Sequence, residues 1–463
     1  MAFAENEKGL APKLLDYAAG LEFSDLPEDV VQYCKLFVMD TLGVALPGYH
    51  APGCAQVADL VKGWSGGGGA SVLIHGFKAP PPLAALANST MMHAMDFDDT
   101  FDPSALHTFV SVLPAALAAA DAVGGVDGKT LIAALVLGVD VINRISLAIR
   151  RPLSWIRTAT CGSFGAAAAA GKILGLDRGQ MQNALGVAYS QTSGNAQGLL
   201  EGRLIKRMQP GLAAQAGVLS AFLAQAGITG SHDFLEGAYG FYNLYERGEY
   251  DPEPVLQGLG RHFTIMGLSL KPYPCCRMTH SSIDAALELR GRVGEQYEHI
   301  SAIEVSTSSM VAEMVGKPFV IGDNPQVDAQ FSIPYTISVA LIRGDVFLKD
   351  FDLEAISDPR VKELADKVKV TADPGVPAKD LMHAAMSIIM NDGSRYETKI
   401  DTPLGNPAKP MTLELSREKF RKCLEQSGLP LDSNRAEELL SFIERLEEAP
   451  EIASLARLMQ ITV

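Results

Sequence analysis

The chain has 463 residues, 47% of them hydrophobic, with a formal net charge of -15 and a pI near 5.1. Such a length can bury large hydrophobic cores and indicates a globular protein of two or three domains. The acidic balance and the lack of a Lys/Arg stripe exclude a phosphate-binding surface, so we expect no nucleic acid partner.

The start of the chain predicts no secretory signal, because residues 1–8 lack a basic segment followed by an apolar one. The most apolar windows, residues 110–120 and 131–142, are too short or too interrupted by charge to span a bilayer. The six cysteines show neither a CxxC pair nor a Cys/His metal spacing. These features predict a cytoplasmic protein with reduced thiols and no membrane partner.

Residues 9–240 predict a mostly helical region, because apolar residues recur there at helical spacing. Leu131, Leu135, Val139 and Ile142 form one such stripe. Alanine and glycine crowd residues 164–174 and 210–217, where small side chains let helix backbones approach closely. We expect the helices of these two segments to be central and buried.

An acidic stretch follows the apolar helix expected over residues 83–92. Its polar members are His93, Asp96, Asp98, Asp99 and Thr100. A calcium loop is disfavoured, because Phe101 stands where such a loop needs a glycine. The stretch therefore predicts either the polar lip of a pocket or a solvated acidic turn that caps two helices.

The sequence changes character near residue 269. Short β-branched segments at 300–306, 368–371, 387–390 and 398–401 alternate with helical patterns at 281–289 and 329–342. This predicts an α+β domain over residues 269–405, and helical spacing returns from residue 411. We expect a mainly α protein with an α+β part: a large helical domain formed by both termini (1–268 and 406–463) and a smaller inserted α+β domain.

Four further segments combine polar side chains with Gly or Pro: residues 157–168, 206–214, 271–280 and 330–335. Together with the stretch from Asp96 to Thr100 and with His107, they resemble the MmgE/PrpD family. That family contains 2-methylcitrate dehydratase, cis-aconitate decarboxylase and iminodisuccinate epimerase. The resemblance covers nearly the whole chain, with five motifs in the family's order.

The resemblance implies an all-helical domain, an inserted α+β lid domain and a homodimer formed through the helical part. It places the active site in the cleft between the domains. It also implies an enzyme that acts on a small di- or tricarboxylate by abstracting a proton next to a carboxylate. No metal ion and no organic cofactor is expected.

Carried over residue by residue, the resemblance implies the active-site residues Asp96, Thr100, His107, Lys206, Lys271 and Tyr335. We expect His107, Lys271, Tyr335 and Asp96 to be catalytic, with His107 as the acid or base. We expect Thr100, Lys206 and Arg277 to bind substrate, because cations near the pocket suit a polycarboxylate. His93 and His280 are expected to play supporting roles, with His280 capping a helix that begins near residue 281.

Three positions depart from the family pattern. Family members commonly carry a histidine at the position of Ile156 and another at that of Gln209, and an extra residue precedes His107 here. A dehydratase or decarboxylase needs a well-stocked acid/base site, whereas an epimerase protonates no leaving group. The sequence therefore favours an epimerase of the iminodisuccinate type. The alternatives are a lyase (cis-aconitate decarboxylase or 2-methylcitrate dehydratase) and a non-catalytic homologue that binds a polycarboxylate.

Overall fold

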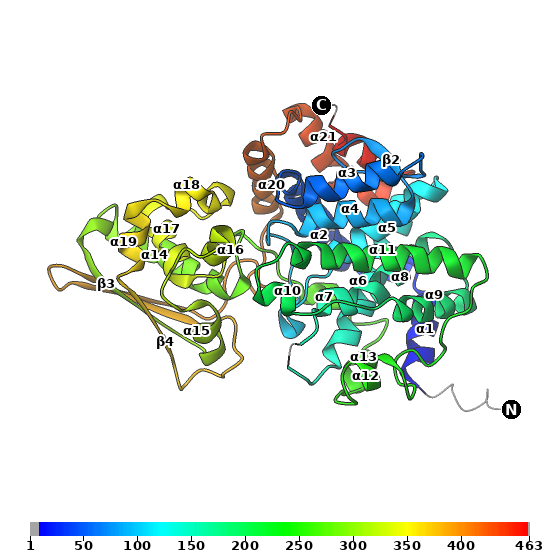
Figure 1. Cartoon of the computed structure of the whole chain (residues 1–463), viewed down its shortest axis with the longest axis horizontal. Helices are drawn as coiled ribbons and strands as arrows, with labels where there is room; N and C mark the ends of the chain where they lie inside the picture. The colour runs from blue at the N-terminus through cyan, green and yellow to red at the C-terminus, as the bar shows by residue number, and fades with distance from the viewer. Residues whose placement is uncertain (1–8, 153, 462–463) are drawn as a thin grey trace. The chain divides into compact units, whose positions relative to one another are not determined.

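The computed structural model describes residues 9–152 and 154–461, and Figure 1 shows its elements in chain order. The chain divides into unit 1, which is Met1–Leu268 with Leu413–Val463, and unit 2, which is Ser269–Thr412. The second boundary lies after residue 412, where the sequence analysis expected 405. Residues up to 409 belong with unit 2, because Leu270 N donates to Gly405 O (2.9 Å) and Lys409 lies 3.7 Å from Asp284.

Unit 1 is predominantly helical. Its α-helices are α1 (Leu10–Gly20), α2 (Glu28–Gly48), α3 (Cys54–Trp64), α4 (Pro81–His93), α5 (Phe109–Val123), α6 (Gly128–Leu147), α7 (Arg157–Thr160), α8 (Gly162–Ile173), α9 (Arg178–Ser190), α10 (Gln197–Leu200), α11 (Ile205–Gln225), α12 (Phe241–Leu244), α13 (Glu253–Leu256), α20 (Leu413–Ser427), α21 (Ser433–Glu444) and α22 (Ala453–Met459). Short 3-10 turns lie at Phe23–Asp25, Asp102–Ser104, Thr264–Gly267 and Leu446–Glu448.

Unit 1 also contains a two-stranded antiparallel hairpin, β1 (Ala70–Val72) and β2 (Phe77–Ala79), so it is not all-helical as expected. The hairpin is stabilised by Asn88 of α4, which accepts from Leu73 N (2.8 Å) and donates to Ser71 O (2.9 Å). A buried amide can supply both groups to a strand edge, and residue periodicity gives no sign of it.

Helices α6, α8 and α11 pack closely at the centre of unit 1, as the small residues predicted. A Cβ added to Gly165 of α8 would lie 2.7 Å from Gly138 O of α6. One added to Gly217 of α11 would lie 2.4 Å from Ala166 Cβ of α8. Glycine is therefore required at these contacts, because any larger side chain would push the helices apart.

Helices α2 and α6 are long and apolar enough to cross a membrane by length and composition. The helix α6 is longer than the apolar window seen in the sequence, because its cap at Asp127 starts it earlier. Their most apolar windows are 83% and 89% buried within the protein. This burial is typical of the core helices of a globular unit.

The C-terminal helices complete unit 1. Helix α20 packs against α2, beside which it lies in Figure 1. Lys419 of α20 lies 2.6 Å from the Asp40 carboxylate of α2, and both side chains are almost fully buried. Its Nζ also donates to Phe97 O (2.9 Å) and lies over the Phe97 ring. The last helices therefore contact the acidic stretch that follows α4.

Unit 2 is built on a four-stranded sheet with the order β4-β3-β5-β6. The strands are β3 (Ile300–Thr307), β4 (Val368–Ala372), β5 (Ala384–Met390) and β6 (Arg395–Ile400); only the β3–β4 pair is parallel. The helices are α14 (His280–Val293), α15 (Ser309–Val315), α16 (Pro325–Gln330), α17 (Ile333–Arg343), α18 (Leu353–Ile356) and α19 (Pro359–Ala365), with 3-10 turns at Arg277–Thr279, Tyr297–His299 and Leu348–Phe351.

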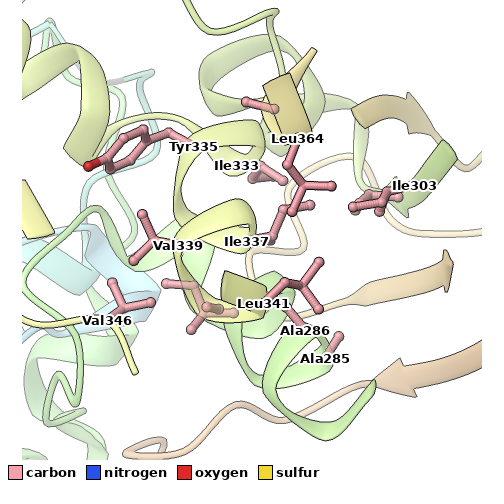
Figure 2. Packing of buried hydrophobic residues seen from close by; sticks show 14 of the residues in the cluster. Ala285, Ala286, Ile303, Ile333, Tyr335, Ile337, Val339, Leu341, Val346 and Leu364 are labelled. Carbon is pink, nitrogen blue, oxygen red and sulfur yellow. The ribbon is translucent and has the colours of Figure 1, made fainter. Parts of the chain in front are cut away.

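The core of unit 2 lies between one face of this sheet and α14, α17 and α19. Figure 2 shows Ile337 and Leu341 of α17 beside Ala286 of α14, with Ile303 of β3 and Leu364 of α19 nearby. Alternate residues of β5 are buried, as a sheet covered on one face requires. The expected combination of a mainly helical part and an α+β part is therefore present.

Candidate active site

The acidic stretch forms the turn between α4 and α5. Helix α4 ends at His93, and Asp96 adopts a left-handed conformation with φ +52° that reverses the chain. At the other end of the turn, Asp99 accepts from Thr108 N (2.9 Å) and Phe109 N (3.1 Å) at the start of α5. Asp99 therefore caps α5, but its side chain is fully buried, so the stretch is not the solvated acidic turn that was one of the two alternatives.

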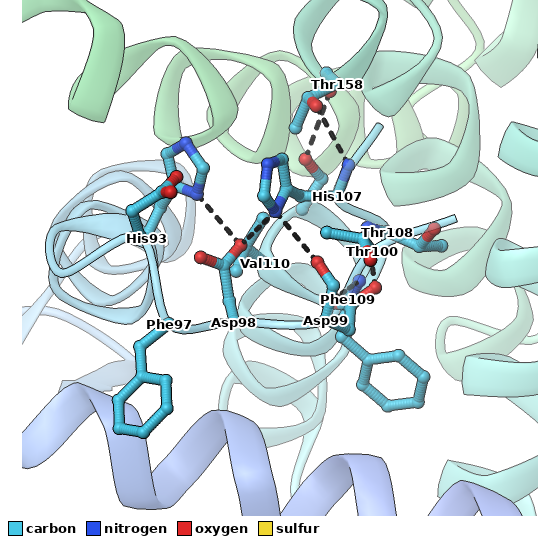
Figure 3. Close-up of polar contacts among 12 residues, drawn as sticks. His93, Phe97, Asp98, Asp99, Thr100, His107, Thr108, Phe109, Val110 and Thr158 are labelled. Atoms are coloured by element: carbon cyan, nitrogen blue, oxygen red, sulfur yellow. Dashed lines mark hydrogen bonds and ion pairs between the residues drawn. The ribbon is translucent and has the colours of Figure 1, made fainter. Parts of the chain in front are cut away.

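A single carboxylate oxygen joins two imidazoles in this turn, as Figure 3 shows. Asp98 Oδ2 lies 2.8 Å from His93 Nδ1 and 2.9 Å from His107 Nδ1. His107 Nδ1 also lies 2.8 Å from the Asp99 backbone oxygen. The side chains of Asp98 and His93 are buried, whereas that of His107 is 17% exposed. His107 is thus the member of the group that a solute can reach.

Burial and charge shift the pKa values of this group in opposite directions. Burial lowers the pKa of His93 to about 4, against the attraction of the Asp98 carboxylate. Burial would raise the pKa of Asp98, but the two histidines outweigh it and hold that pKa well below its usual range. Burial and the Asp98 charge raise the pKa of Asp99 to about 7. Asp98 is therefore an ionised carboxylate and His93 a neutral imidazole near neutral pH.

The backbone of His107 is fixed by a neighbouring motif. His107 N donates to Thr158 Oγ1 (3.0 Å) in α7. The residue before α7 is Ile156, so no imidazole stands at the position where the resemblance implies one. Sequence reasoning assigned no role to Thr158, although it lies in the segment 157–168 that carries the resemblance.

Two of the predicted site residues form an ion pair. Lys206, in the first turn of α11, lies 3.0 Å from Asp96 Oδ1, and the two side chains are 19% and 11% exposed. Thr100 Oγ1 donates to Asp102 Oδ1 (2.8 Å). One turn after Lys206, the Gln209 amide donates to Asn195 O (3.0 Å). Unit 1 therefore brings Asp96 and Lys206 into direct contact.

Lys271 and Arg277 are buried in unit 2, with 1% and 6% of their surfaces exposed. Arg277 donates to Leu404 O (3.2 Å), and its Nη1 lies 3.2 Å from His280 Nδ1. His280 Nε2 lies 3.3 Å from Cys275 O. His280 is the first residue of α14, and the N-cap position of this helix is Thr279, so the expectation that His280 caps it is wrong. Its ring instead contacts Arg277.

Tyr335 lies in the core of unit 2, in the first turn of α17. Its ring packs between Phe319 and Phe351, with centroid distances of 4.9 and 5.9 Å, and its hydroxyl donates to Asp350 O. Burial raises the pKa of the hydroxyl well above its usual value. The hydroxyl proton of Tyr335 is donated to a backbone carbonyl in this structure. A proton-relay role for Tyr335 stays a prediction.

The seven predicted site residues thus divide between the units. Unit 1 carries Asp96, Thr100, His107 and Lys206, and unit 2 carries Lys271, Arg277 and Tyr335. Sequence reasoning assigned no role to two residues. Asp98 lies in the turn itself, and Lys419 of α20 contacts the turn. Asp98 stands in the recognised motif, but Lys419 lies 322 residues from Phe97 and has no motif to reveal it.

One group of three among the described residues has the spacing to bind a metal ion: His93, Asp98 and His107, with donor atoms within 4.8 Å of one another. The nitrogen–oxygen distances of 2.8 and 2.9 Å are typical of hydrogen bonds. A zinc ion needs bonds of about 2.0–2.2 Å and would have to separate the Asp98 oxygen from both rings. As they stand, the three side chains form a hydrogen-bonded group.

Comparison with known proteins extends over both units. Residues 12–253 match the model of the MmgE/PrpD N-terminal domain and residues 273–447 that of the MmgE/PrpD C-terminal domain. Cis-aconitate decarboxylase of Aspergillus terreus is 28% identical over 99% of this chain and 97% of its own length. Cis-aconitate decarboxylase of Mus musculus is 28% identical over 95% and 91%. A mitochondrial 2-methylcitrate dehydratase of Yarrowia lipolytica is 23% identical over 81% and 76%. The chain belongs to the MmgE/PrpD family.

Proposed function

We propose that this protein is a lyase that acts on a small polycarboxylate, with decarboxylation of cis-aconitate as the first candidate reaction. The similarity to cis-aconitate decarboxylases over 95–99% of the chain supports this choice. It favours the lyase alternative over the epimerase that the sequence analysis preferred. The observation that supports this chemistry is the partly exposed His107, whose Nδ1 contacts Asp98. The same turn contains Asp96, which pairs with Lys206 of α11.

Decarboxylation requires positive charge and one proton. The bond to the departing carboxyl carbon breaks, its electron pair shifts through the neighbouring double bond, and the resulting carbanion takes up a proton. In our proposal His107 supplies that proton from Nε2, and the nearby Asp98 carboxylate stabilises the imidazolium beforehand. Lys206 binds a substrate carboxylate, and its contact with Asp96 is weakened when it does so. We place Lys271 and Arg277 as further carboxylate ligands and Thr100 as a hydrogen-bond donor.

A dehydratase is the second candidate, supported by the similarity to 2-methylcitrate dehydratase over 81% of the chain. That reaction needs one group to remove a carbon-bound proton and another to protonate the departing hydroxyl. His107 would be the base. The losses at Ile156 and Gln209 leave fewer acids for the second step, which is why we place this reaction second.

The test is to incubate the purified protein in deuterated water with cis-aconitate, 2-methylcitrate or iminodisuccinate separately. We expect carbon dioxide release from cis-aconitate with one deuterium incorporated per product molecule. Alkene formation from 2-methylcitrate alone would favour the second candidate, and α-deuteration of iminodisuccinate alone would favour the epimerase. Inertness toward all three would contradict our proposal.

The His107→Gln variant ties the activity to the site. Glutamine keeps a hydrogen bond but its amide cannot act as an acid near pH 7, so we expect kcat to fall by roughly 10²- to 10⁴-fold. His232→Gln, which removes a histidine of unit 1 outside the turn, is the matched control and should leave kcat unchanged. Equal rates for His107→Gln and the wild type would remove His107 from the proposal.

We also propose the homodimer that the family resemblance implies. Light scattering on the purified protein should give about twice the chain mass of 49.4 kDa. A mass equal to that of a single chain over the working concentration range would contradict it.

A further inference from the structure

We propose that Asp98 is a positioning residue that fixes the tautomer of His107, so that Nδ1 always carries a hydrogen and Nε2 is the nitrogen that exchanges a proton with substrate. This inference rests on the proposed role of His107 as the acid. It adds to that role the residue that selects one ring nitrogen for the chemistry. Asp98 touches no substrate in this scheme and acts only through the ring of His107.

The first step of the argument is the pair of acceptors around His107 Nδ1. Asp98 Oδ2 lies 2.9 Å and the Asp99 backbone oxygen 2.8 Å from this nitrogen. A backbone carbonyl only accepts hydrogen bonds, and so does an ionised carboxylate. Both contacts are therefore satisfied only when Nδ1 carries its hydrogen, which leaves Nε2 to gain or lose the second proton.

The second step is that, among the described residues, the Asp98 carboxylate contacts only the two imidazoles. Its Oδ2 accepts from the two imidazoles, and its Oδ1 makes no hydrogen bond within residues 9–152 and 154–461. A fully buried carboxylate with only imidazole partners is costly unless those partners carry hydrogen toward it. The neighbouring Asp99 is occupied at the start of α5, so it is not available to replace Asp98.

The third step concerns His93, which lies at the end of α4 and is 2% exposed. Its Nδ1 contacts the same Asp98 oxygen, and its ring meets that of His107 with centroids 4.7 Å apart and planes at 68°. His93 therefore holds the carboxylate in place from the buried side. His107 lies on the exposed side, and in this scheme its Nε2 is the atom that exchanges a proton with substrate.

The charges that face the group come from three elements. His93 belongs to α4, Asp96 and Asp99 to the turn, and Lys206 to α11. The Lys206–Asp96 pair is close to neutral as a whole, and the Asp99 carboxylate accepts from two backbone N–H groups at the start of α5. Asp98 is therefore the carboxylate in direct contact with the His107 ring that favours its cationic form.

The first experiment is to compare Asp98→Asn with the wild type across pH. Asparagine keeps the shape of the side chain but loses the charge, and its amide can present either a donor or an acceptor to Nδ1. We expect kcat to fall by roughly 10²- to 10⁴-fold, as for other carboxylates that orient a catalytic histidine. We also expect the basic limb of the kcat/KM profile to move to lower pH by about one unit, because the imidazolium loses its counter-charge.

The control is Asp127→Asn, which removes the same charge at the N-cap of α6. Asp127 accepts from Thr130 N (2.8 Å) and has no part in the proposed site. This variant should keep both the rate and the pH profile of the wild type. If Asp98→Asn also keeps them, Asp98 does not position His107.

The second experiment reads the tautomer directly and needs no substrate. Proton–nitrogen correlation spectra of histidine-labelled wild-type protein, with His107 assigned through His107→Gln, should show Nδ1 protonated at every pH from about 5 to 8. Asp98→Asn should show a mixture of tautomers. A wild-type His107 protonated on Nε2 alone would overturn the inference even if the variant failed to fold. Inactivity toward the tested substrates would contradict the proposed function without affecting this measurement.

Discussion

In the proposed function, a substrate carboxylate must compete with Asp96 for the Lys206 ammonium group. Both side chains are mostly buried and lie 3.0 Å apart, so the cation is already partly neutralised. A substrate carboxylate can compete for Lys206 because a lysine ammonium has three donors and Asp96 uses only part of them. The ion pair thus keeps the cation in place before substrate arrives.

We therefore predict that Lys206→Met raises KM by roughly 10- to 100-fold with a smaller effect on kcat. The reason is that charge-assisted hydrogen bonds to carboxylates contribute about 1.5–3 kcal/mol. Steady-state kinetics measures the effect, with Lys172→Met as the control because Lys172 is also ion-paired (Glu22, 2.6 Å) but on α8. An unchanged KM would show that Lys206 does not bind substrate.

Tyr335 gives the opposite expectation, because its hydroxyl already has a backbone partner in the core. We predict that Tyr335→Phe lowers the free energy of unfolding by about 1–3 kcal/mol, since the buried Asp350 carbonyl loses its donor. Chemical denaturation and steady-state kinetics should be measured on the same preparation. A loss of kcat of a hundredfold or more with unchanged stability would instead assign the proton-relay role predicted from the sequence.

At the scale of elements, local patterns in the sequence predicted most of the secondary structure. The four expected β segments correspond to β3–β6, because each alternates or concentrates β-branched residues over one strand length. The helix expected over residues 329–342 is instead two helices, α16 and α17. Ser332 accepts from Tyr335 N (3.2 Å) and caps α17, and Pro334 lies in its first turn, so a new helix begins there.

The close packing of α8 and α11 gives a stability prediction. A Cβ at Gly217 would lie 2.6 Å from Ala167 N and 2.4 Å from Ala166 Cβ, so Gly217→Ala must displace one helix. We expect the free energy of unfolding to fall by about 1–3 kcal/mol, as in other overpacked cores.

Gly63→Ala is the matched control, because Gly63 lies in helix α3 and a Cβ there would meet nothing within 4 Å. It should raise stability by up to about 1 kcal/mol through helix propensity. Thermal or denaturant unfolding compares the two variants. Equal effects would show that the close approach of α8 and α11 does not limit side-chain size.

At the scale of the whole molecule, the sequence predicted two parts and singled out the polar stretch after α4, but it did not predict the contacts that connect distant segments. The motif around Asp96 and His107 was visible because its polar residues interrupt apolar helices. The sharing of one Asp98 oxygen was not, since it depends on how α4 and α5 leave the turn. The contact between Lys419 and Phe97 O joins residues 322 positions apart, and local periodicity carries no information about such pairs.

We predict that Lys419→Met lowers the free energy of unfolding by about 3–5 kcal/mol, because it leaves the Asp40 carboxylate buried beside an apolar side chain. It should also lower kcat, because Phe97, between Asp96 and Asp98, loses the donor to its carbonyl. Denaturation curves and kinetics test both effects, with Lys422→Met on the same helix as the control.

The double variant Asp40→Asn/Lys419→Met separates the two effects. Removing the buried carboxylate charge should recover part of the stability but none of the lost kcat. Recovery of both together would show that Lys419 acts on the turn only through overall stability.

The same lysine also bears on the order in which the protein becomes complete during its synthesis. A nascent chain that has emerged through unit 2 contains every predicted site residue, yet α20 has still to be translated. Until then the Phe97 carbonyl lacks the ammonium group that binds it in the finished protein. Unit 2 is therefore synthesised before unit 1 is complete, and a chain that stops before Lys419 contains every candidate site residue but lacks the donor to the Phe97 carbonyl.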